Sequence, residues 1–143
     1  MDKEIKNFEE KAFLVRVLGI VFDPKTKKIL IGRRENDPNV EKLKWSFPGG
    51  RPEHDEKLEE GLKREVKEKT GLSVESIGVI FARIFSEENR FLNIYYLCEA
   101  VGGEEKAGEK FKEIKWVNPE ELEKYFTTSF HPKLKEYILG LVN

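Results

Sequence analysis

The chain has 143 residues, enough for one domain with a single sizeable hydrophobic core. Its 27 acidic and 26 basic residues nearly cancel, so no net field favours nucleic acid or an anionic membrane as a partner. Because Cys98 is the only cysteine, an internal disulfide is excluded, and its place in an apolar run predicts a buried thiol rather than a nucleophile.

The N-terminal segment 1–12 is charged and lacks the apolar core of a signal peptide. No stretch approaches the roughly 18 consecutive apolar residues that a membrane-spanning helix needs. We therefore expect a cytoplasmic protein, either a monomer or a homodimer, with one domain over residues 1–143.

Six apolar runs rich in β-branched and aromatic residues predict strands. They cover residues 13–22, 29–31, 45–47, 77–86, 91–101 and 111–117. The first two flank the turn sequence DPKTKK and predict an antiparallel hairpin, and residues 87–90 form the turn between the fourth and the fifth. The segment 102–110, GGEEKAGEK, predicts a flexible loop before the last strand.

A helix is predicted over 56–69, which contains no proline, one glycine and many good helix formers. Leu58, Leu62 and Val66 recur at i, i+4 and i+8 and form a narrow apolar stripe that would pack onto a sheet. Gly71 is a C-terminal stop signal. Shorter helices at 118–125 and 133–142 complete the pattern, and this order of elements predicts an α+β or layered α/β fold.

The central helix carries two carboxylates on one side. At about 100° per residue, Glu65 and Glu68 share the flank away from the apolar stripe, where they can hold a hard divalent cation such as Mg²⁺. Arg64 lies four residues before Glu68 and can orient that carboxylate by a charge-assisted hydrogen bond. Charge patterning alone favours the alternative, an exposed helix with Lys–Glu pairs.

The full spacing favours the site. Gly50, five residues, Glu56, seven residues and then the segment 64–72, REVKEKTGL, closely resemble the Nudix box, G-x5-E-x7-R-E-U-x-E-E-x-G-U, where U is aliphatic. Eight of the nine specified positions match, and the preceding Phe-Pro-Gly resembles the usual lead-in of the family. The departure is Lys69, where the family has a glutamate that is commonly a metal ligand.

The resemblance implies the Nudix α/β/α sandwich with a mixed central sheet. It also implies hydrolysis of a nucleoside diphosphate linked to another moiety, with Mg²⁺ or Mn²⁺ as cofactor. The implied metal ligands are Glu65, Glu68 and the backbone carbonyl of Gly50, with Arg64 as an orienter of the glutamates. Glu56 is implied as a support of the loop and the helix.

A separate general base is implied in the loop before the last strand, where Glu109 is the candidate and Glu105 the next. Two arginines, Arg34 and Arg51, are predicted to fork phosphate oxygens of the substrate. Aromatic residues of the strands offer a stacking face for a base, although such residues are more often core. They are Trp45, Phe47, Phe81, Phe85, Tyr95 and Tyr96.

A fainter resemblance, carried by the segment 32–51, points to the GDP-mannose mannosyl hydrolase branch. That branch keeps the glutamate replaced here by Lys69 and has a histidine in the loop before the last strand. The two histidines of this chain, His54 and His131, lie elsewhere in the sequence and are expected to be structural.

Three readings therefore compete. The leading one is a pyrophosphohydrolase of a nucleotide sugar or a similar derivative. The second is a nucleoside triphosphate pyrophosphohydrolase of the housecleaning type, and the third is a nucleotide-binding module that has lost turnover. A purely structural domain would leave the spacing of the box unexplained.

Lys69 is predicted to lie between Glu65 and the apolar stripe, beside the place of a metal ion, because it follows Glu65 by four residues. Its ammonium group would compete with the cation for that carboxylate. Either fewer metal ions bind, or carboxylates of the 102–110 loop complete the shell, and both alternatives predict a weakened dependence on Mg²⁺.

Overall fold

The computed structural model describes residues 9–41, 43–108 and 110–143. Within these residues the strands form a seven-stranded mixed sheet. The strands are β1 (Leu14–Asp23), β2 (Lys28–Arg34), β3 (Trp45–Ser46), β4 (Gly49–Gly50), β5 (Leu72–Ile84), β6 (Phe91–Gly103) and β7 (Phe111–Val117). The helical elements are α2 (Leu58–Thr70), the 3-10 turn η1 (Pro119–Glu121), α3 (Leu122–Tyr125) and α4 (Pro132–Gly140).

The main path of the sheet runs in the order β3-β2-β1-β6-β5, with β4 paired to β1 and β7 paired to β2. The predicted hairpin is confirmed, because β1 and β2 pair antiparallel at Phe22 and Ile29. Most of β1, however, pairs in parallel with β6, from Leu14 opposite Phe91 onwards. This pairing joins segments far apart in the chain and places β1 at the centre of the sheet.

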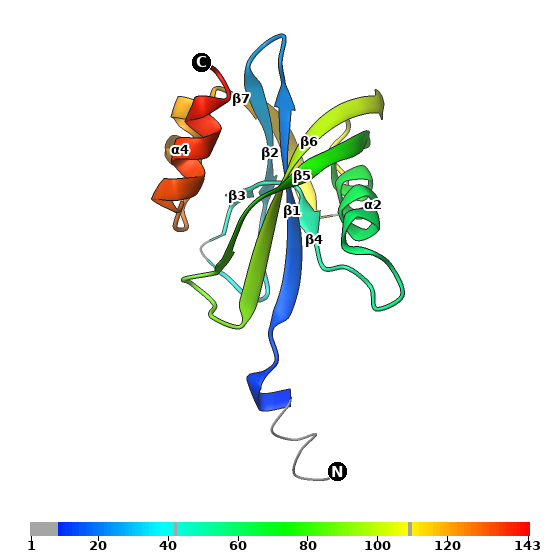
Figure 1. Ribbon diagram of the computed structural model, residues 1–143, viewed down its shortest axis with the longest axis vertical. Coiled ribbons are helices and arrows are strands. Elements are labelled where there is room, and N and C mark those ends of the chain that lie inside the picture. The colour runs from blue at the N-terminus through cyan, green and yellow to red at the C-terminus, as the bar shows by residue number, and fades with distance from the viewer. Residues whose placement is uncertain (1–8, 42, 109) are drawn as a thin grey trace.

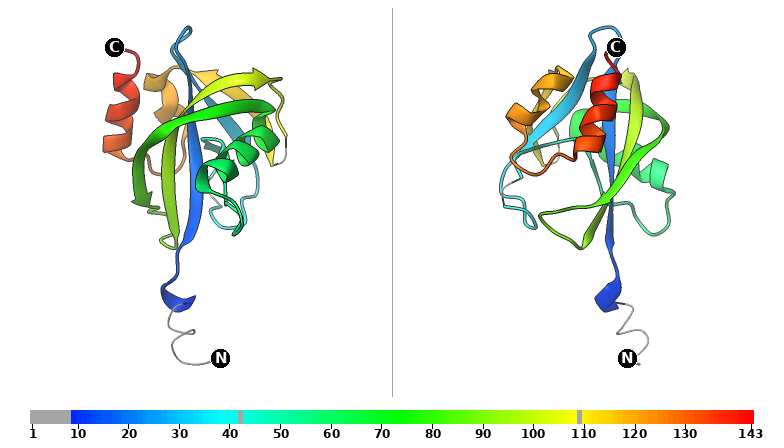
Figure 2. Two further views of the ribbon diagram at one scale, coloured as in Figure 1. Left: turned by 45° about the vertical axis from the view of Figure 1, so that its right-hand side comes forward. Right: turned by 60° about the vertical axis from the view of Figure 1, so that its left-hand side comes forward.

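Helices cover both faces of the sheet (Figures 1 and 2). Helix α2 packs on one face, and α3 and α4 pack on the other. Side chains alternate along β1, so Val17 and Val21 join the cluster beneath α2 while Ile20 joins the cluster beneath α3 and α4. The predicted α/β/α sandwich with a mixed sheet is confirmed.

Helix α2 begins two residues later and ends one residue later than predicted, and Gly71 ends it in the left-handed conformation with φ 77°. Leu62 and Val66 are fully buried against the sheet, as expected. The third stripe residue, Leu58, was predicted to be buried and is 41% exposed. Because the direction drifts by about 40° at every fourth residue, Leu58 points about 80° away from Val66, and it lies in the first turn.

We expect Leu62→Ala to lower the free energy of unfolding by about 2–5 kcal/mol, because it deletes a fully buried side chain and leaves a cavity. Leu58→Ala is the matched control on the same helix, and it should cost less than about 1 kcal/mol. Chemical denaturation of both variants measures the difference. Equal losses would show that the two leucines pack alike.

Other boundaries shift where strand pairing extends beyond the apolar runs. Strand β5 begins at Leu72, directly after Gly71, because Leu72 pairs with Gly103 at the far end of β6. The predicted flexible loop therefore begins two residues later than expected. No helix in the described part of the chain is long and apolar enough to cross a membrane.

Two side chains confirm structural roles predicted for them. Cys98 is buried in the core beneath α2, and desolvation raises the pKa of its thiol to about 12, so the thiolate nucleophile is disfavoured. His131 precedes α4, and its Nδ1 accepts a hydrogen bond of 3.1 Å from the backbone N–H of Lys133. His131 is thus the cap of a helix.

Candidate active site

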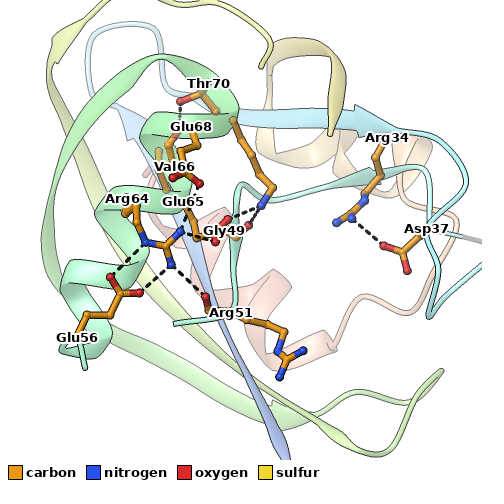
Figure 3. Close-up of polar contacts among 11 residues, drawn as sticks. Arg34, Asp37, Gly49, Arg51, Glu56, Arg64, Glu65, Val66, Glu68 and Thr70 are labelled. Carbon is orange, nitrogen blue, oxygen red and sulfur yellow. Dashed lines mark hydrogen bonds and ion pairs between the residues drawn. The ribbon is translucent and has the colours of Figure 1, made fainter. Parts of the chain in front are cut away.

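The guanidinium of Arg64 is the hub of the predicted site (Figure 3). It contacts both oxygens of Glu56, at 2.7 and 3.2 Å, and one oxygen of Glu65 at 2.8 Å. It also lies 3.3 Å from Glu68 and donates at 3.2 Å to the backbone carbonyl of Arg51. Arg64 therefore ties the loop after β4 to the two glutamates of α2.

Glu56 joins the loop to the helix in the way that the resemblance implies. Its Oε1 accepts a hydrogen bond of 2.7 Å from the backbone N–H of Glu53, in addition to the bonds from Arg64. These bonds, that of Arg64 first, lower the pKa of Glu56 from its usual value. The same pairing raises the pKa of Arg64, so both groups are charged at neutral pH.

Glu65 is held between two cations of the chain. One of its carboxylate oxygens contacts Arg64, and the other accepts a hydrogen bond of 2.6 Å from Nζ of Lys69. The same Nζ donates to the backbone carbonyl of Gly49 at 2.7 Å. The Lys69 side chain is only 9% exposed and that of Glu65 14%, so this is a largely buried pair and not a surface ion pair.

The Glu65 carboxylate occupies the space that a side chain at position 50 would fill. A Cβ atom placed on Gly50 would lie 2.4 Å from Oε2 of Glu65, closer than real Cβ contacts come. The absence of a side chain thus lets the Glu65 carboxylate reach the backbone of β4. Glu68 is different, since its side chain is 40% exposed and lies at the open side of the site.

The oxygen atoms between α2 and β4 do not fit a divalent metal ion in this arrangement. The carbonyl of Gly49 and Oε2 of Glu65 both accept a hydrogen bond from the Lys69 ammonium, which lies between them. Among the described residues, no group of three or more carboxylate, histidine or cysteine side chains is placed to hold a metal. Binding through the Gly50 carbonyl remains a prediction.

A polar cleft of about 810 Å³ opens beside these residues. Five cationic side chains and three carboxylates line it. They are Arg16, Arg34, Arg51, Lys69 and Lys110, with Asp37, Glu65 and Glu68. The excess of cations suits an anionic ligand. Both predicted phosphate ligands, Arg34 and Arg51, therefore line one cleft with the glutamates of α2.

A second cleft of about 600 Å³, with six aromatic residues in its lining, adjoins the polar one, and Arg16, Arg34, Gly49 and Gly50 line both. Its aromatic residues are Trp45, Phe47, Phe85, Tyr95, Phe126 and Phe130. Of the six aromatic residues considered from the sequence, Phe81 and Tyr96 are not in this lining.

The junction of the two clefts contains arginines that sequence reasoning missed. Asn93 of β6 pairs in register with Arg16 of β1 and with Arg83 of β5, so three polar side chains form a row across three strands. Nε of Arg16 donates to Asn93 at 2.8 Å, and the Arg16 guanidinium lies 4.2 Å from the centre of the Phe91 ring. An arginine within an otherwise apolar strand was the available signal.

Two arginines that line these clefts, Arg34 and Arg83, keep N–H donors that make no hydrogen bond within the described residues. Arg34 pairs with Asp37 at 2.8 Å, and Arg83 donates to Ser129 at 2.9 and 3.1 Å. Within the described residues, Nε of Arg34 and Nε of Arg83 are buried without a hydrogen-bond partner. Desolvation lowers the pKa of Arg16. Buried guanidinium groups with free donors favour a ligand that supplies acceptor oxygens.

Of the two predicted general bases, only Glu105 is among the described residues, and it is not at the junction. Glu109 lies outside the described residues. Glu105 accepts a hydrogen bond of 2.8 Å from Nε1 of Trp116 at the surface, and it is absent from the lining of both clefts. Among the described residues of this loop, Lys110 lines the polar cleft.

The chain is similar to known proteins over most of its length. The family model of the NUDIX domain matches residues 12–138. The ADP-ribose pyrophosphatase of Methanocaldococcus jannaschii is 36% identical over 113 residues, which cover 77% of this chain and 64% of that protein. The chain thus spans less than two thirds of the length of this relative. Nucleoside triphosphatase NudI of Escherichia coli is 28% identical over 108 residues, 67% of this chain and 77% of that protein.

The fold is also similar to that of solved structures. The crystal structure of a MutT protein from Methanosarcina mazei Go1 matches with a TM-score of 0.70 at 23% identity, over 92% of this chain and 94% of that one. At this identity the likeness shows the fold alone. The family match spans most of the sequence, and together with the box geometry around Arg64 it leads to one conclusion. The chain belongs to the Nudix hydrolase family.

Proposed function

We propose that this protein hydrolyses a pyrophosphate bond in a nucleoside diphosphate linked to another moiety, such as a nucleotide sugar. The observation that carries the proposal is the junction of two clefts at Arg16, Arg34 and the Gly49-Gly50 strand. One cleft is cationic and borders the glutamates of α2, and the other is aromatic. A nucleotide has the matching composition, because its phosphates are anionic and its base is planar and apolar on its faces.

The diphosphate would lie in the polar cleft, where this chain supplies its positive charge. A diphosphate is doubly anionic and repels an attacking water, so its charge must be neutralised before hydrolysis. Arg34 and Arg51 can fork phosphate oxygens, and the buried free Nε of Arg34 is a donor for one of them. The nucleoside would then extend over Arg16 into the aromatic cleft.

Nudix hydrolases generally use divalent metal ions, and we propose Mg²⁺ or Mn²⁺ for this chain. Mg²⁺ is commonly bound through one or two carboxylates together with phosphates of the substrate, where it neutralises charge and activates water. Both oxygens of Glu65 contact cations of the chain, whereas Glu68 is half-exposed at the cleft. Glu68 is therefore the carboxylate best placed to meet an ion that arrives with the diphosphate.

Two other functions have an observation in their favour. Hydrolysis of a nucleoside triphosphate is favoured by the five cationic side chains of the polar cleft, which suit a third phosphate. The two relatives compared above represent both substrate classes, one being an ADP-ribose pyrophosphatase and the other a nucleoside triphosphatase. A nucleotide-binding module without turnover is favoured by the Lys69 ammonium between Gly49 and Glu65.

The test is a panel of nucleoside diphosphate sugars, ADP-ribose, dinucleotides and nucleoside triphosphates, each incubated with Mg²⁺ or Mn²⁺ and followed by product identification. A nucleoside monophosphate plus a sugar phosphate supports the proposal. A monophosphate plus pyrophosphate identifies the triphosphate enzyme, and binding without products identifies the module. If no compound of the panel is bound or hydrolysed, all three hypotheses are contradicted.

Within this proposal, Arg51→Ala should raise the Michaelis constant about tenfold and change turnover less, because it removes one charge-assisted bond to the ground-state diphosphate. Steady-state kinetics on the best substrate measures both constants. Arg90→Ala is the control, since Arg90 is an exposed arginine of the β5–β6 turn that lines neither cleft. An unchanged Michaelis constant in Arg51→Ala would remove Arg51 from the binding site.

A further inference from the structure

The ammonium group of Lys69 lies between β4 and the carboxylates of α2. Nζ of Lys69 joins a backbone carbonyl of β4 to a carboxylate of α2, at 2.7 Å from Gly49 and 2.6 Å from Glu65. Carbonyl and carboxylate oxygens are the ligands that hard divalent cations prefer. The fold thus places two oxygen atoms of the kind that bind metal ions close together, and Lys69 donates a hydrogen bond to each.

The direction of the helix explains why Lys69 reaches this position. At about 100° per residue, Lys69 points only about 60° away from Val66, closer to the core direction than the half-exposed Leu58 does. The side chain consequently runs along the buried side of α2 and is 9% exposed. Its charge is compensated where it ends, because Glu65 accepts from it.

A divalent ion cannot share this position. The second oxygen of Glu65 already contacts Arg64 at 2.8 Å, so the carboxylate has no oxygen that is free of a cation. Two further positive charges beside an ammonium group that water hardly reaches would repel it strongly. The site can therefore hold either the Lys69 ammonium or a metal ion. In this protein the ammonium is always present, because it is part of the chain.

We propose that Lys69 is a tethered replacement for one divalent metal ion, so that this protein binds one metal ion fewer than a variant with a carboxylate at position 69. In this arrangement Glu65 is a positioning residue that holds Lys69. An ammonium group has three N–H donors, and Gly49 and Glu65 take two of them. The third is available to a phosphate oxygen in the polar cleft, which Lys69 lines.

The inference rests on the site of the proposed function but on no substrate, so we test it by metal binding alone. Mn²⁺ is titrated into the wild type, Lys69→Glu and Lys67→Glu, and bound ion is counted by electron paramagnetic resonance. Lys67→Glu is the matched control because Lys67 is an exposed lysine of the same helix, 3.3 Å from Ser73, and the substitution changes the charge by the same two units.

We expect Lys69→Glu to gain one bound Mn²⁺ per chain, with an affinity at least about tenfold above any site of the wild type. Lys67→Glu should gain less than about twofold, since an added exposed charge is screened by water and salt. The proposal is overturned if Lys69→Glu gains no more than Lys67→Glu, or if the wild type already binds as many ions as tightly.

A second pair of variants covers the case in which Lys69→Glu does not fold without metal. Lys69→Gln removes the ammonium without adding a carboxylate, and Lys67→Gln is its control. Mn²⁺ should raise the melting temperature of Lys69→Gln more than that of Lys67→Gln, because an additional ion that binds the folded state stabilises it further. Equal responses overturn the proposal. A hydrolase panel without products would leave these binding results unaffected, so the two failures are distinguishable.

Discussion

Glu65→Gln is expected to lower the turnover number about 100-fold or more while the protein stays folded. The amide keeps the shape of the side chain but loses the negative charge that faces Arg64 at 2.8 Å and Lys69 at 2.6 Å. Both cations would then lose their fixed positions beside the polar cleft, and supporting contacts of this kind contribute about 10- to 100-fold each. Steady-state kinetics on the best substrate of the panel measures the effect.

Glu60→Gln is the control for this experiment, because Glu60 is an exposed glutamate in the first turn of the same helix. Its turnover should equal that of the wild type. Circular dichroism of both variants establishes that the helix is intact. Wild-type turnover in Glu65→Gln would show that the reaction does not depend on the negative charge of Glu65 in α2, and the assignment of the site would be wrong.

Arg64→Met is expected to produce the second large effect, a combined loss of stability and turnover. The substitution keeps an unbranched side chain but removes the guanidinium that joins Glu56, Glu65 and the Arg51 carbonyl. These groups and Glu68 then lose their bonds to Arg64, and the loop after β4 loses this connection to α2. Thermal denaturation and kinetics on the same preparation measure the two losses together.

The dependence of stability on pH tests the cause. The pKa of Glu56 is lowered in the folded protein, chiefly by Arg64, so this pairing stabilises the fold above the unfolded pKa of about 4.5 and is lost as the pH falls through the folded value. Arg64→Met should therefore lose less stability than the wild type between about pH 6 and pH 3.

Lys63→Met is the control, because Lys63 is the neighbouring cation of α2 and pairs with Glu75 at the surface, where ion pairs contribute little. Its melting temperature and its pH profile should match those of the wild type. If Arg64→Met and Lys63→Met behave alike, the contacts of Arg64 are ordinary surface contacts and the hub has no structural importance.

The sequence by itself determined the local elements and the carboxylate face. The helix α2, its end at Gly71 and the contact of Arg64 with Glu68 depend on spacing within about one or two helical turns, which follows from a fixed rotation per residue. The same rotation placed Lys69 beside Glu65. Strand positions followed from composition, although β5 begins at Leu72 instead of residue 77.

Only the tertiary structure decided what these elements meet. The parallel pairing of β1 with β6 and the antiparallel pairing of β6 with β5 bring Arg16, Asn93 and Arg83 into one row. Arg16 and Asn93 are 77 residues apart, so their contact leaves no periodic signal in the sequence. Likewise, the ammonium of Lys69 reaches Gly49 because β4 docks against α2, and that contact turns an apparent surface lysine into the buried cation of the site.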